Sequence, residues 1–484
     1  MHRLFEVIEH ISGRVNLNLR EFSFDVSPYL KGLIDFEKLP GLYASYGLST
    51  DHPLNFNFTD SSLAGSYFLG NCRADGSIVH KSDVRGDELK LKGQVFEQDG
   101  HSVSLTEDEQ IWLKESFLNK TLVHNFSHDI ENPELFHIEH TVAMPYANIH
   151  GAPVEGSFLG AFSTIDLTTV HDSIIGEFAY VQTGELDHAR VEPGRIWVKG
   201  PDFEFNFCHD PKVLKKYISH KPGRAPEGLL MEFREALKPH IHKIFSTVKT
   251  DLCQVDQAPS EVRGVPVQEG SYLSEFAVVR GDCRIGSNVL VAQRAFLENA
   301  RLEKGANAQE NCYIIDSRLE ELDITAHGGK VVKAHLGPRV FTGFNSLVRG
   351  AKGAPLVVGA ETIIMPHTII DLTEPLEIPA RSLVWGFIQN KEDLNHNSIS
   401  LEQLAEADFG VEKGGMRFTG KGGSFVSAFE HRLHHILEAN GAFYDGADET
   451  RGHAQMSQRI TYNVLQPYAA GDLLGMHPSI SIKP

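Results

Sequence analysis

The clearest pattern in the chain is an aliphatic residue at every sixth position. A period of six is neither the 3.6-residue repeat of a helix nor the simple alternation of a half-buried strand. It is typical of a solenoid in which each short strand places one side chain inward before the chain turns a corner. The pattern predicts a parallel β-helix from Val265 to Ile388. Its opening series is Val267, Leu273, Val279, Ile285, Val291 and Leu297.

The six-residue register is interrupted further along the chain. It slips by one residue at Leu302, breaks again around 319–330, and returns at Leu336 and at Val358. We expect these slips to mark loops that are pushed out of a coil.

Weaker copies of the pattern occur upstream. The segments that begin at Leu63 and Val154 echo the one that begins at Gln268, and Val84–Asp87 repeats as Val279–Asp282. Residues 60–200 are therefore expected to be β-rich. They form either a second, more irregular β-helical section or a β-sandwich.

Helical spacing separates these β regions. Apolar residues three and four apart predict helices over 212–219, 229–250 and 424–440, with a Pro-Gly break at 222–226. The glycine cluster at 410–423 is the best linker candidate, and residues 462–484 show no clear pattern. The predicted fold is mainly β and divides into a β-rich N-terminal domain (1–205), a helical insertion (206–260), the β-helix (261–390) and a glycine-rich linker with a helical extension (391–484).

Composition narrows the class of protein. No apolar run approaches the ~18–20 residues of a membrane span, and the N-terminus does not resemble a secretory signal. The five widely spread cysteines are typical of the reducing cytoplasm. A formal net charge of −19 disfavours nucleic acid as a partner. We expect a cytoplasmic protein that acts on a small molecule and binds neither membrane nor nucleic acid.

Several segments then resemble a known family. Phe276–Asp282, with Arg280 and Asp282, is similar to the opening motif of γ-class carbonic anhydrases, and Asn307–Glu310 is similar to their N-x-Q-D/E stretch. The turn Ile378–Gly386 resembles the last coil of hexapeptide-repeat transferases. The resemblance implies a left-handed β-helix and a homotrimer. It also implies an interfacial ion pair between Arg280 and Asp282, with Asn307 and Gln309 around the active site.

The metal ligands of that family are incomplete here. Its zinc sites use one histidine six residues after the Gln and a later pair separated by five. Counted from Gln309, these positions fall on Ile315, His327 and Val332. A catalytic zinc needs three protein ligands and an open position, so the standard site is not expected. A rebuilt zinc site would draw on His327, His335, His367 and Asp316, which could meet only across a subunit interface or after a loop folds back.

Acyl transfer is the second interpretation. Hexapeptide acyltransferases commonly use one histidine as a general base, and coenzyme A would then be the co-substrate. His327 is the first candidate for this role and His335 the second, with Asn345 and Arg349 placed to bind polar substrate atoms. A third interpretation is an inactive assembly or ligand-binding protein that has lost the ancestral chemistry.

Other polar clusters are interpreted as structural. His124, His128, His137, His140 and His150 have spacings that fit no recognised ligand pattern, and His431 and His435 share a helix face without a third ligand. Arg85 and Asp87 are expected to form an ion pair equivalent to that of Arg280 and Asp282.

Overall fold

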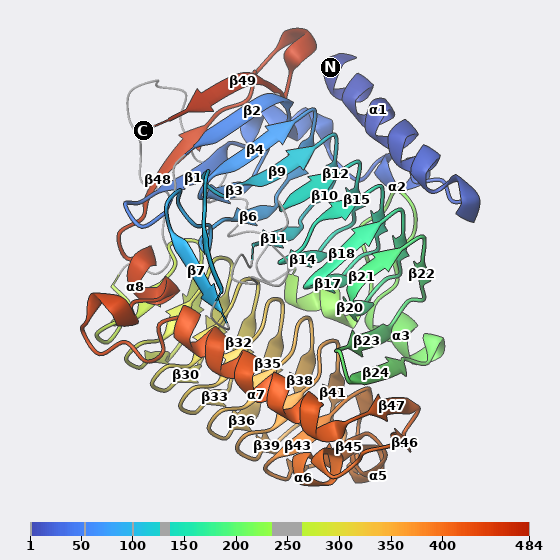
Figure 1. Cartoon of the computed structure of the whole chain (residues 1–484), viewed down its shortest axis with the longest axis vertical. Coiled ribbons are helices and arrows are strands. Elements are labelled where there is room, and N and C mark those ends of the chain that lie inside the picture. Colours follow the sequence, from blue (N-terminus) through green and yellow to red (C-terminus); the bar gives the residue numbers. More distant parts are fainter. Residues whose placement is uncertain (1, 53–54, 99–100, 126–135, 235–263, 484) are drawn as a thin grey trace.

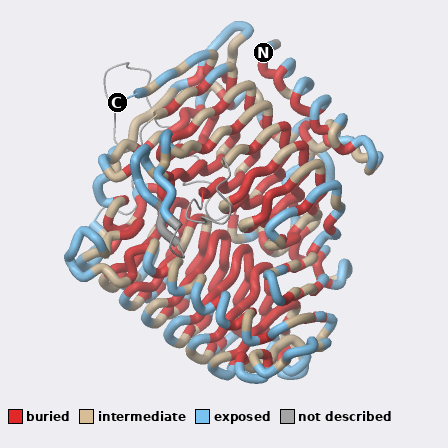
Figure 2. The backbone as a smooth tube through the Cα atoms, in the orientation of Figure 1, coloured by how far each residue is buried: buried red, intermediate tan, exposed pale blue. Residues whose placement is uncertain are grey.

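The computed structural model describes residues 2–52, 55–98, 101–125, 136–234 and 264–483. Its main feature is a pair of parallel β-helices that lie side by side (Figure 1). The predicted fold class, mainly β with a parallel β-helix, is confirmed. Figure 2 shows that the linings of both coils are buried and that many of the turns at their rims are exposed.

The first β-helix is built from three parallel sheets. Its coils have a constant length where Asn148, Thr164, Tyr180 and Ile196 are successive register partners. Val123, Ile149 and Ile165 point into its core. The first sheet contains β1 (Ala44–Leu48), β3 (Tyr67–Leu69), β6 (Asp83–Arg85), β11 (Leu122–His124), β14 (Asn148–His150), β17 (Thr164–Asp166), β20 (Tyr180–Gln182) and β23 (Arg195–Lys199). The second contains β2 (Phe56–Ser61), β4 (Cys72–Asp75), β9 (Ile111–Lys114), β12 (His137–Glu139), β15 (Val154–Glu155), β18 (Thr168–His171) and β21 (Gly184–Asp187). The third contains β5 (Ile78–His80), β10 (Phe117–Asn119), β13 (Val142–Ala143), β16 (Phe158–Leu159), β19 (Ile174–Ile175) and β22 (Arg190–Val191).

The second β-helix occupies the segment that the period of six predicts. Its first sheet contains β25 (Tyr272–Leu273), β28 (Leu290–Val291), β31 (Asn307–Ala308), β34 (Ile324–Thr325), β37 (Phe341–Thr342), β40 (Ile363–Ile364) and β43 (Ser382–Val384). Its second contains β26 (Val278–Arg280), β29 (Phe296–Glu298), β32 (Tyr313–Ile315), β35 (Lys330–Val332), β38 (Leu347–Arg349), β41 (Ile369–Asp371) and β44 (Phe387–Ile388). Its third contains β27 (Arg284–Ile285), β30 (Arg301–Leu302), β33 (Arg318–Leu319), β36 (Ala334–Leu336), β39 (Leu356–Val358) and β42 (Glu377–Ile378).

Coil length explains the slips in the sequence register. Leu290, Asn307, Ile324 and Phe341 are successive register partners, so each of these coils falls one position short of three full hexapeptides. The slip at Leu302 is therefore a shorter coil and not the extruded loop that the pattern predicts. A loop does leave the coil between Phe341 and its partner Ile363, because this coil is longer than the ones before it.

Helices cover the outer faces. In α1 (His2–Asn18), Leu4, Val7, Ile11 and Val15 are spaced as an apolar stripe and pack into a core that includes Phe117 of the third sheet. Other helices include α2 (Ser27–Leu30), α3 (Pro211–Tyr217), α5 (Lys391–His396), α6 (Leu401–Ala405), α7 (Gly422–Ala439) and α8 (His453–Ser457), with 3-10 turns η1 (Arg20–Phe22), η2 (Phe36–Gly41), η3 (Asp448–Thr450) and η4 (Gly471–Leu473). Residues 229–234 are helical as predicted. Residues 235–250 of the predicted insertion helix lie outside the described residues. None of the helices in the described part of the chain is both long and apolar enough to cross a bilayer.

The C-terminal segment returns to both β-helices. The glycine cluster at 410–423 is not a linker, because it forms β46 (Val411–Lys413) and β47 (Met416–Gly420), which extend the first β-helix through β24 (Phe203–Cys208). The tail pairs antiparallel with the first coil through β48 (Thr461–Leu465) and β49 (His477–Ile482). Between them, α7 packs on the first sheet of the second β-helix, in one cluster with Ile324 and Phe341. The remaining strands are β45 (Ser398–Ser400) and the hairpin of β7 (Val95–Gln98) and β8 (His101–Ser104).

Candidate metal centre between the two β-helices

One register position of the first β-helix carries polar residues on four consecutive coils. Register pairs join Arg85 to His124, His124 to His150, and His150 to Asp166. Adjacent strands lie ~4.8 Å apart, so the two imidazoles are neighbours. Side chains alternate along a strand, and Ile149 points into the coil. The four polar side chains therefore project outward, toward the second β-helix.

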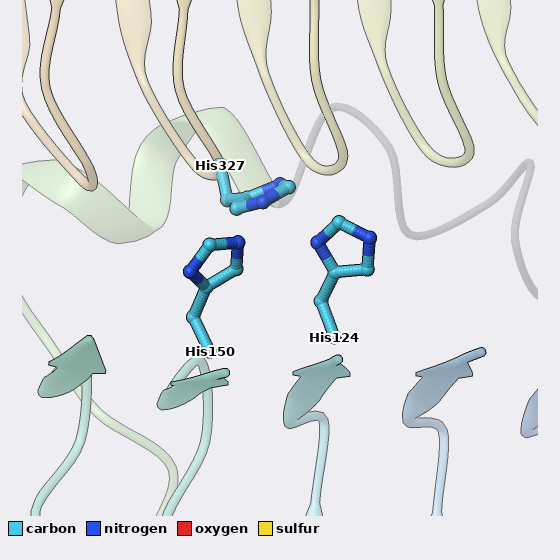
Figure 3. A group of neighbouring side chains, drawn as sticks. All are labelled: His124, His150 and His327. Carbon is cyan, nitrogen blue, oxygen red and sulfur yellow. The ribbon is translucent and has the colours of Figure 1, made fainter. Parts of the chain in front are cut away.

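The second β-helix supplies a third histidine at this interface. His327 follows β34 at a corner of the coil, and its ring centroid lies 5.5 Å from those of His124 and His150. One ring nitrogen from each histidine can be chosen so that all three lie within 4.8 Å of one another. Figure 3 shows His327 opposite the other two rings. All three residues are buried.

Each of these imidazoles contacts its own carboxylate. His150 Nδ1 lies 2.8 Å from Asp166 Oδ1, His327 Nδ1 lies 2.7 Å from Glu310 Oε2, and His124 Nε2 lies 3.0 Å from Asp87 Oδ1. A carboxylate beside one ring nitrogen leaves the other nitrogen for a metal, an arrangement found in many metal sites. Of the three contacts only that of His150 has hydrogen-bond geometry; His327 Nδ1 and both ring nitrogens of His124 are buried without a hydrogen-bond partner among the described residues.

Arg85 joins the carboxylates across the interface. Its guanidinium pairs with Asp87 on its own β-helix and with Glu310 on the other. All three side chains are buried. The expected ion pair of Arg85 and Asp87 is present, but it belongs to the histidine cluster. A buried pair of this kind is costly to break, because the remaining charge would be left uncompensated.

Burial sets the charge states of the cluster. It lowers the pKa of His124, and it lowers the pKa of His327 well below the ordinary value, with nearby His150 and Arg85 acting in the same direction. Both imidazoles are therefore neutral near pH 7, the form that binds a metal. Burial opposes ionisation of Asp87, but Arg85 and the neighbouring histidines hold its pKa well below the usual range.

A small cavity adjoins the histidines. It has a volume of about 30 Å³, which corresponds to roughly two or three water-sized spaces. One wall is apolar and the C-terminal segment closes the other side. The lining residues are Glu88, His124, His150, Gln309, Ala326, His327, Phe341, Phe344, Arg432, Ile436, Ala439, Asn440 and His453.

The structure places the other expected metal ligands elsewhere. His335 is half-exposed on the third sheet and lies 2.9 Å from Glu320. Asp316 is exposed and accepts a hydrogen bond from Asn299. His367 is buried between the Thr164 hydroxyl and the Phe178 carbonyl, and burial lowers its pKa to about 3.

The expected substrate-binding residues Gln309, Asn307 and Asn345 have different surroundings. Gln309 lines the cavity beside His327. Asn307 is buried in β31, and its side-chain amide has no hydrogen-bond partner among the described residues. Asn345 instead donates to the Phe162 carbonyl across the interface, so its contact is structural.

Arg280 and Asp282 lie on another face. Arg280 stacks on the Phe296 ring, and the carboxylate of Asp282 is exposed, 4.0 Å from Arg301. Arg280 lines a separate cavity of about 580 Å³ together with Ile315 and Val332, the positions where the family pattern would place metal ligands. Arg349, also in this lining, pairs with Asp371.

His124 and His150, which the sequence pattern did not mark as site residues, belong to the three-histidine cluster. His150 and Asp166 are partners on adjacent coils of the regular length, which is the signal that could have linked them. His124 and His150 are also partners on neighbouring coils, but the coil between them is longer, and that extra length concealed the repeat. Arg432 and His453 enter from the C-terminal segment, and no local motif marks either of them.

Comparison with known proteins agrees with the architecture. A family model described as "Hexapeptide repeat including loop" matches residues 101–222, so the coils define a hexapeptide-repeat protein. A solved structure from Desulfovibrio desulfuricans G20, described as a "putative acetyltransferase", is 51% identical, covers 100% of this chain and 99% of that chain, and has a TM-score of 0.91. The chain belongs to the same hexapeptide-repeat family as that protein.

More distant similarities are much weaker. A "putative acetyltransferase" from Bacillus cereus is 11% identical, with 37% of this chain and 90% of that chain covered and a TM-score of 0.27. LpxA from Acinetobacter baumannii is also 11% identical, with coverage of 77% and 89% and a TM-score of 0.15. No curated protein sequence matches the chain.

Proposed function

We propose that the protein is a metal-dependent enzyme for a small molecule, with zinc held by His124, His150 and His327. The observation that carries this proposal is the convergence of three buried imidazoles, each backed by a carboxylate, at the interface of the two β-helices. Three histidines with an open fourth position are the ligand set of hydrating zinc enzymes.

The donor set fits a zinc ion. Nitrogens within 4.8 Å of one another can converge on one ion with metal–nitrogen bonds of about 2.0–2.1 Å after small side-chain adjustments. The carboxylate contacts leave Nε2 of His150, Nε2 of His327 and Nδ1 of His124 as the coordinating atoms. The three histidines come from both β-helices. The site therefore does not need ligands at Ile315 and Val332, the positions where the family pattern would place them.

The chemistry follows from the ion and from the shape of the cavity. A bound zinc lowers the pKa of its water to about 7 and so supplies a nucleophile at neutral pH. Phe341, Phe344 and Ala326 form an apolar wall beside the histidines, and Gln309 offers an amide to orient a polar substrate atom. A cavity of about 30 Å³ favours a substrate of a few atoms, so we propose hydration of carbon dioxide or a molecule of similar size.

Acyl transfer is the second candidate, and the name of the relative that is 51% identical supports it. In that case neutral His327 would act as the general base. At about 30 Å³ the cavity beside His327 is too small for the pantetheine arm of coenzyme A, so this reaction would require the C-terminal segment to move. An alternative without catalysis predicts neither metal nor coenzyme A binding.

Metal titration tests the first candidate. Metal-free protein should bind one zinc per chain. His124→Ala, His150→Ala and His327→Ala should each weaken binding at least about 100-fold, since each removes one of the three protein ligands. His335→Ala is the matched control, because this histidine contacts a carboxylate but is half-exposed on another sheet; it should bind zinc normally.

Activity then separates the candidates. The zinc-loaded protein should hydrate carbon dioxide in a stopped-flow indicator assay, and His327→Ala should not. No zinc binding, together with a thermal shift on adding acetyl-coenzyme A that His327→Ala abolishes, would overturn the metal proposal and support acyl transfer. The expected homotrimer is not required for either reaction, since one chain supplies all three histidines.

A further inference from the structure

Helix α7 extends the histidine cluster through a single side chain. Arg432, in the middle of α7, reaches the ladder of the first β-helix and donates to Asp166 Oδ2 at 2.6 Å and to Gln182 Oε1 at 2.9 Å. The other oxygen of Asp166 is the one that contacts His150 Nδ1 at 2.8 Å. Arg432, Asp166 and His150 therefore form a continuous series of contacts from α7 to one imidazole of the cluster.

We propose that Arg432 is a positioning residue that sets the orientation and the coordinating nitrogen of His150 through Asp166. Docking of α7 and metal binding are thereby coupled. The inference rests on the proposed metal site and assigns to it a component from outside both β-helices.

The contact between Arg432 and Asp166 is buried. Asp166 is fully buried, and the side chain of Arg432 is only 16% exposed. Arg432 and Tyr180 hold Oδ2 of Asp166, so Oδ1 faces Nδ1 of His150 at 2.8 Å and leaves Nε2 as the coordinating nitrogen.

Among the described residues, Arg432 is the lysine or arginine that contacts the carboxylate of Asp166, and its other contacts are not with such a permanent positive charge. Tyr180 contacts the same carboxylate oxygen as Arg432, and Gln182 accepts from both Arg432 and Tyr180. These neutral groups orient the carboxylate but cannot balance its charge. Without Arg432, Asp166 would lose the buried ion pair that fixes its orientation toward His150.

The packing of α7 also relies on apolar contacts that do not involve Arg432. Phe425 is fully buried and Phe429 is nearly so, both in the cluster with Ile324 and Phe341 of the second β-helix. Removing the guanidinium therefore leaves the apolar face of the helix in place. A neutral variant is expected to fold, which allows its metal affinity to be measured.

A second contact supports the same coupling. His453 of α8 lies 3.5 Å from Glu88 and 3.8 Å from Asp87, the carboxylate beside His124. The C-terminal segment thus touches the carboxylates behind two of the three histidines. Coupling between two equilibria is reciprocal, so a metal that tightens the cluster must also tighten the docking of residues 422–457.

Cobalt(II) titration of the full-length protein tests the proposal, because its visible absorption reports the coordination geometry of the histidines. Arg432→Gln should lower cobalt affinity about 10–100-fold and alter the visible spectrum, as changes in outer partners of metal-bound histidines do. Arg432→Lys should recover most of the affinity. Glu430→Gln is the control on the same helix, since Glu430 is exposed and pairs only at 3.7 Å with Arg381; it should match the native protein.

Hydrogen exchange supplies an independent readout. Cobalt should increase protection of residues 422–457 in the native protein and much less in Arg432→Gln. Native affinity, spectrum and protection in Arg432→Gln would overturn the inference while leaving the three-histidine site intact. Failure of the native protein to bind cobalt would instead refute the metal site on which the inference depends.

Discussion

Lys330 offers a sharp test of how the two β-helices are packed. This lysine is fully buried in β35, donates from Nζ to the Gly328 carbonyl at 2.5 Å, and lies 5.6 Å from the Phe162 ring of the first β-helix. It forms no carboxylate ion pair among the described residues. Burial, with a smaller contribution from Arg234, lowers its pKa from 10.5 to about 7.

The pKa difference fixes the sign and size of the effect. Between pH 7 and 10.5 the unfolded chain binds a proton at Lys330 that the folded protein does not, so stability rises with pH through this window. The full difference corresponds to about 5 kcal/mol. Lys330→Met removes this cost and loses one hydrogen bond worth about 1 kcal/mol. We therefore expect the variant to be more stable at pH 7 by a few kcal/mol.

The assay is guanidinium unfolding of both proteins at pH 7 and again near pH 10. The advantage of Lys330→Met should be large at pH 7 and should shrink as pH rises. Lys304→Met is the control, because Lys304 is exposed in a turn of the same β-helix; it should change neither midpoint. Equal midpoints for Lys330→Met and the native protein at pH 7, or a difference independent of pH, would refute the reasoning.

Two further substitutions test the coil stacking and the interface. A Cβ at Gly343 would lie 2.4 Å from the backbone nitrogen of Pro366 on the next coil. Gly343→Ala should therefore lower the free energy of unfolding by about 1–3 kcal/mol. Gly13→Ala is the control, because a Cβ at Gly13 would have nothing within 4 Å; it should not destabilise the protein. Arg294→Met would remove the ion-pair partner of the buried carboxylate of Asp83, 3.0 Å away, and should lower the free energy of unfolding by about 3–5 kcal/mol. Adding Asp83→Asn should recover part of this loss. Unchanged melting temperatures for Gly343→Ala or Arg294→Met would count against the packing described.

The sequence pattern predicts the second β-helix well because its core needs one aliphatic residue at each inward position. Val291 and Leu297 satisfy this rule and are buried. The same rule could not show that some coils fall short of three full hexapeptides, since coil length is decided by how turns stack. It also could not place the tail, whose strands β48 and β49 are defined only by pairing with β1 and β2.

The candidate site was only partly predictable for a related reason. His327 could be identified from its motif, because its neighbours along the chain resemble a known family. His124, His150 and Arg432 lie far from it in sequence, and they meet it only because the two β-helices and α7 pack against one another. Long-range contacts of this kind leave no local periodicity. The aliphatic residues at Ile315 and Val332 line a different cavity, so the family's ligand spacing points to another face than the one that carries the three histidines.

Anomalous diffraction at the zinc edge from crystals of the zinc-loaded protein tests the central claim most directly. The account predicts one strong peak among the rings of His124, His150 and His327, and its loss in His150→Ala. A peak at other residues, or no peak in crystals of protein saturated with zinc, would contradict it.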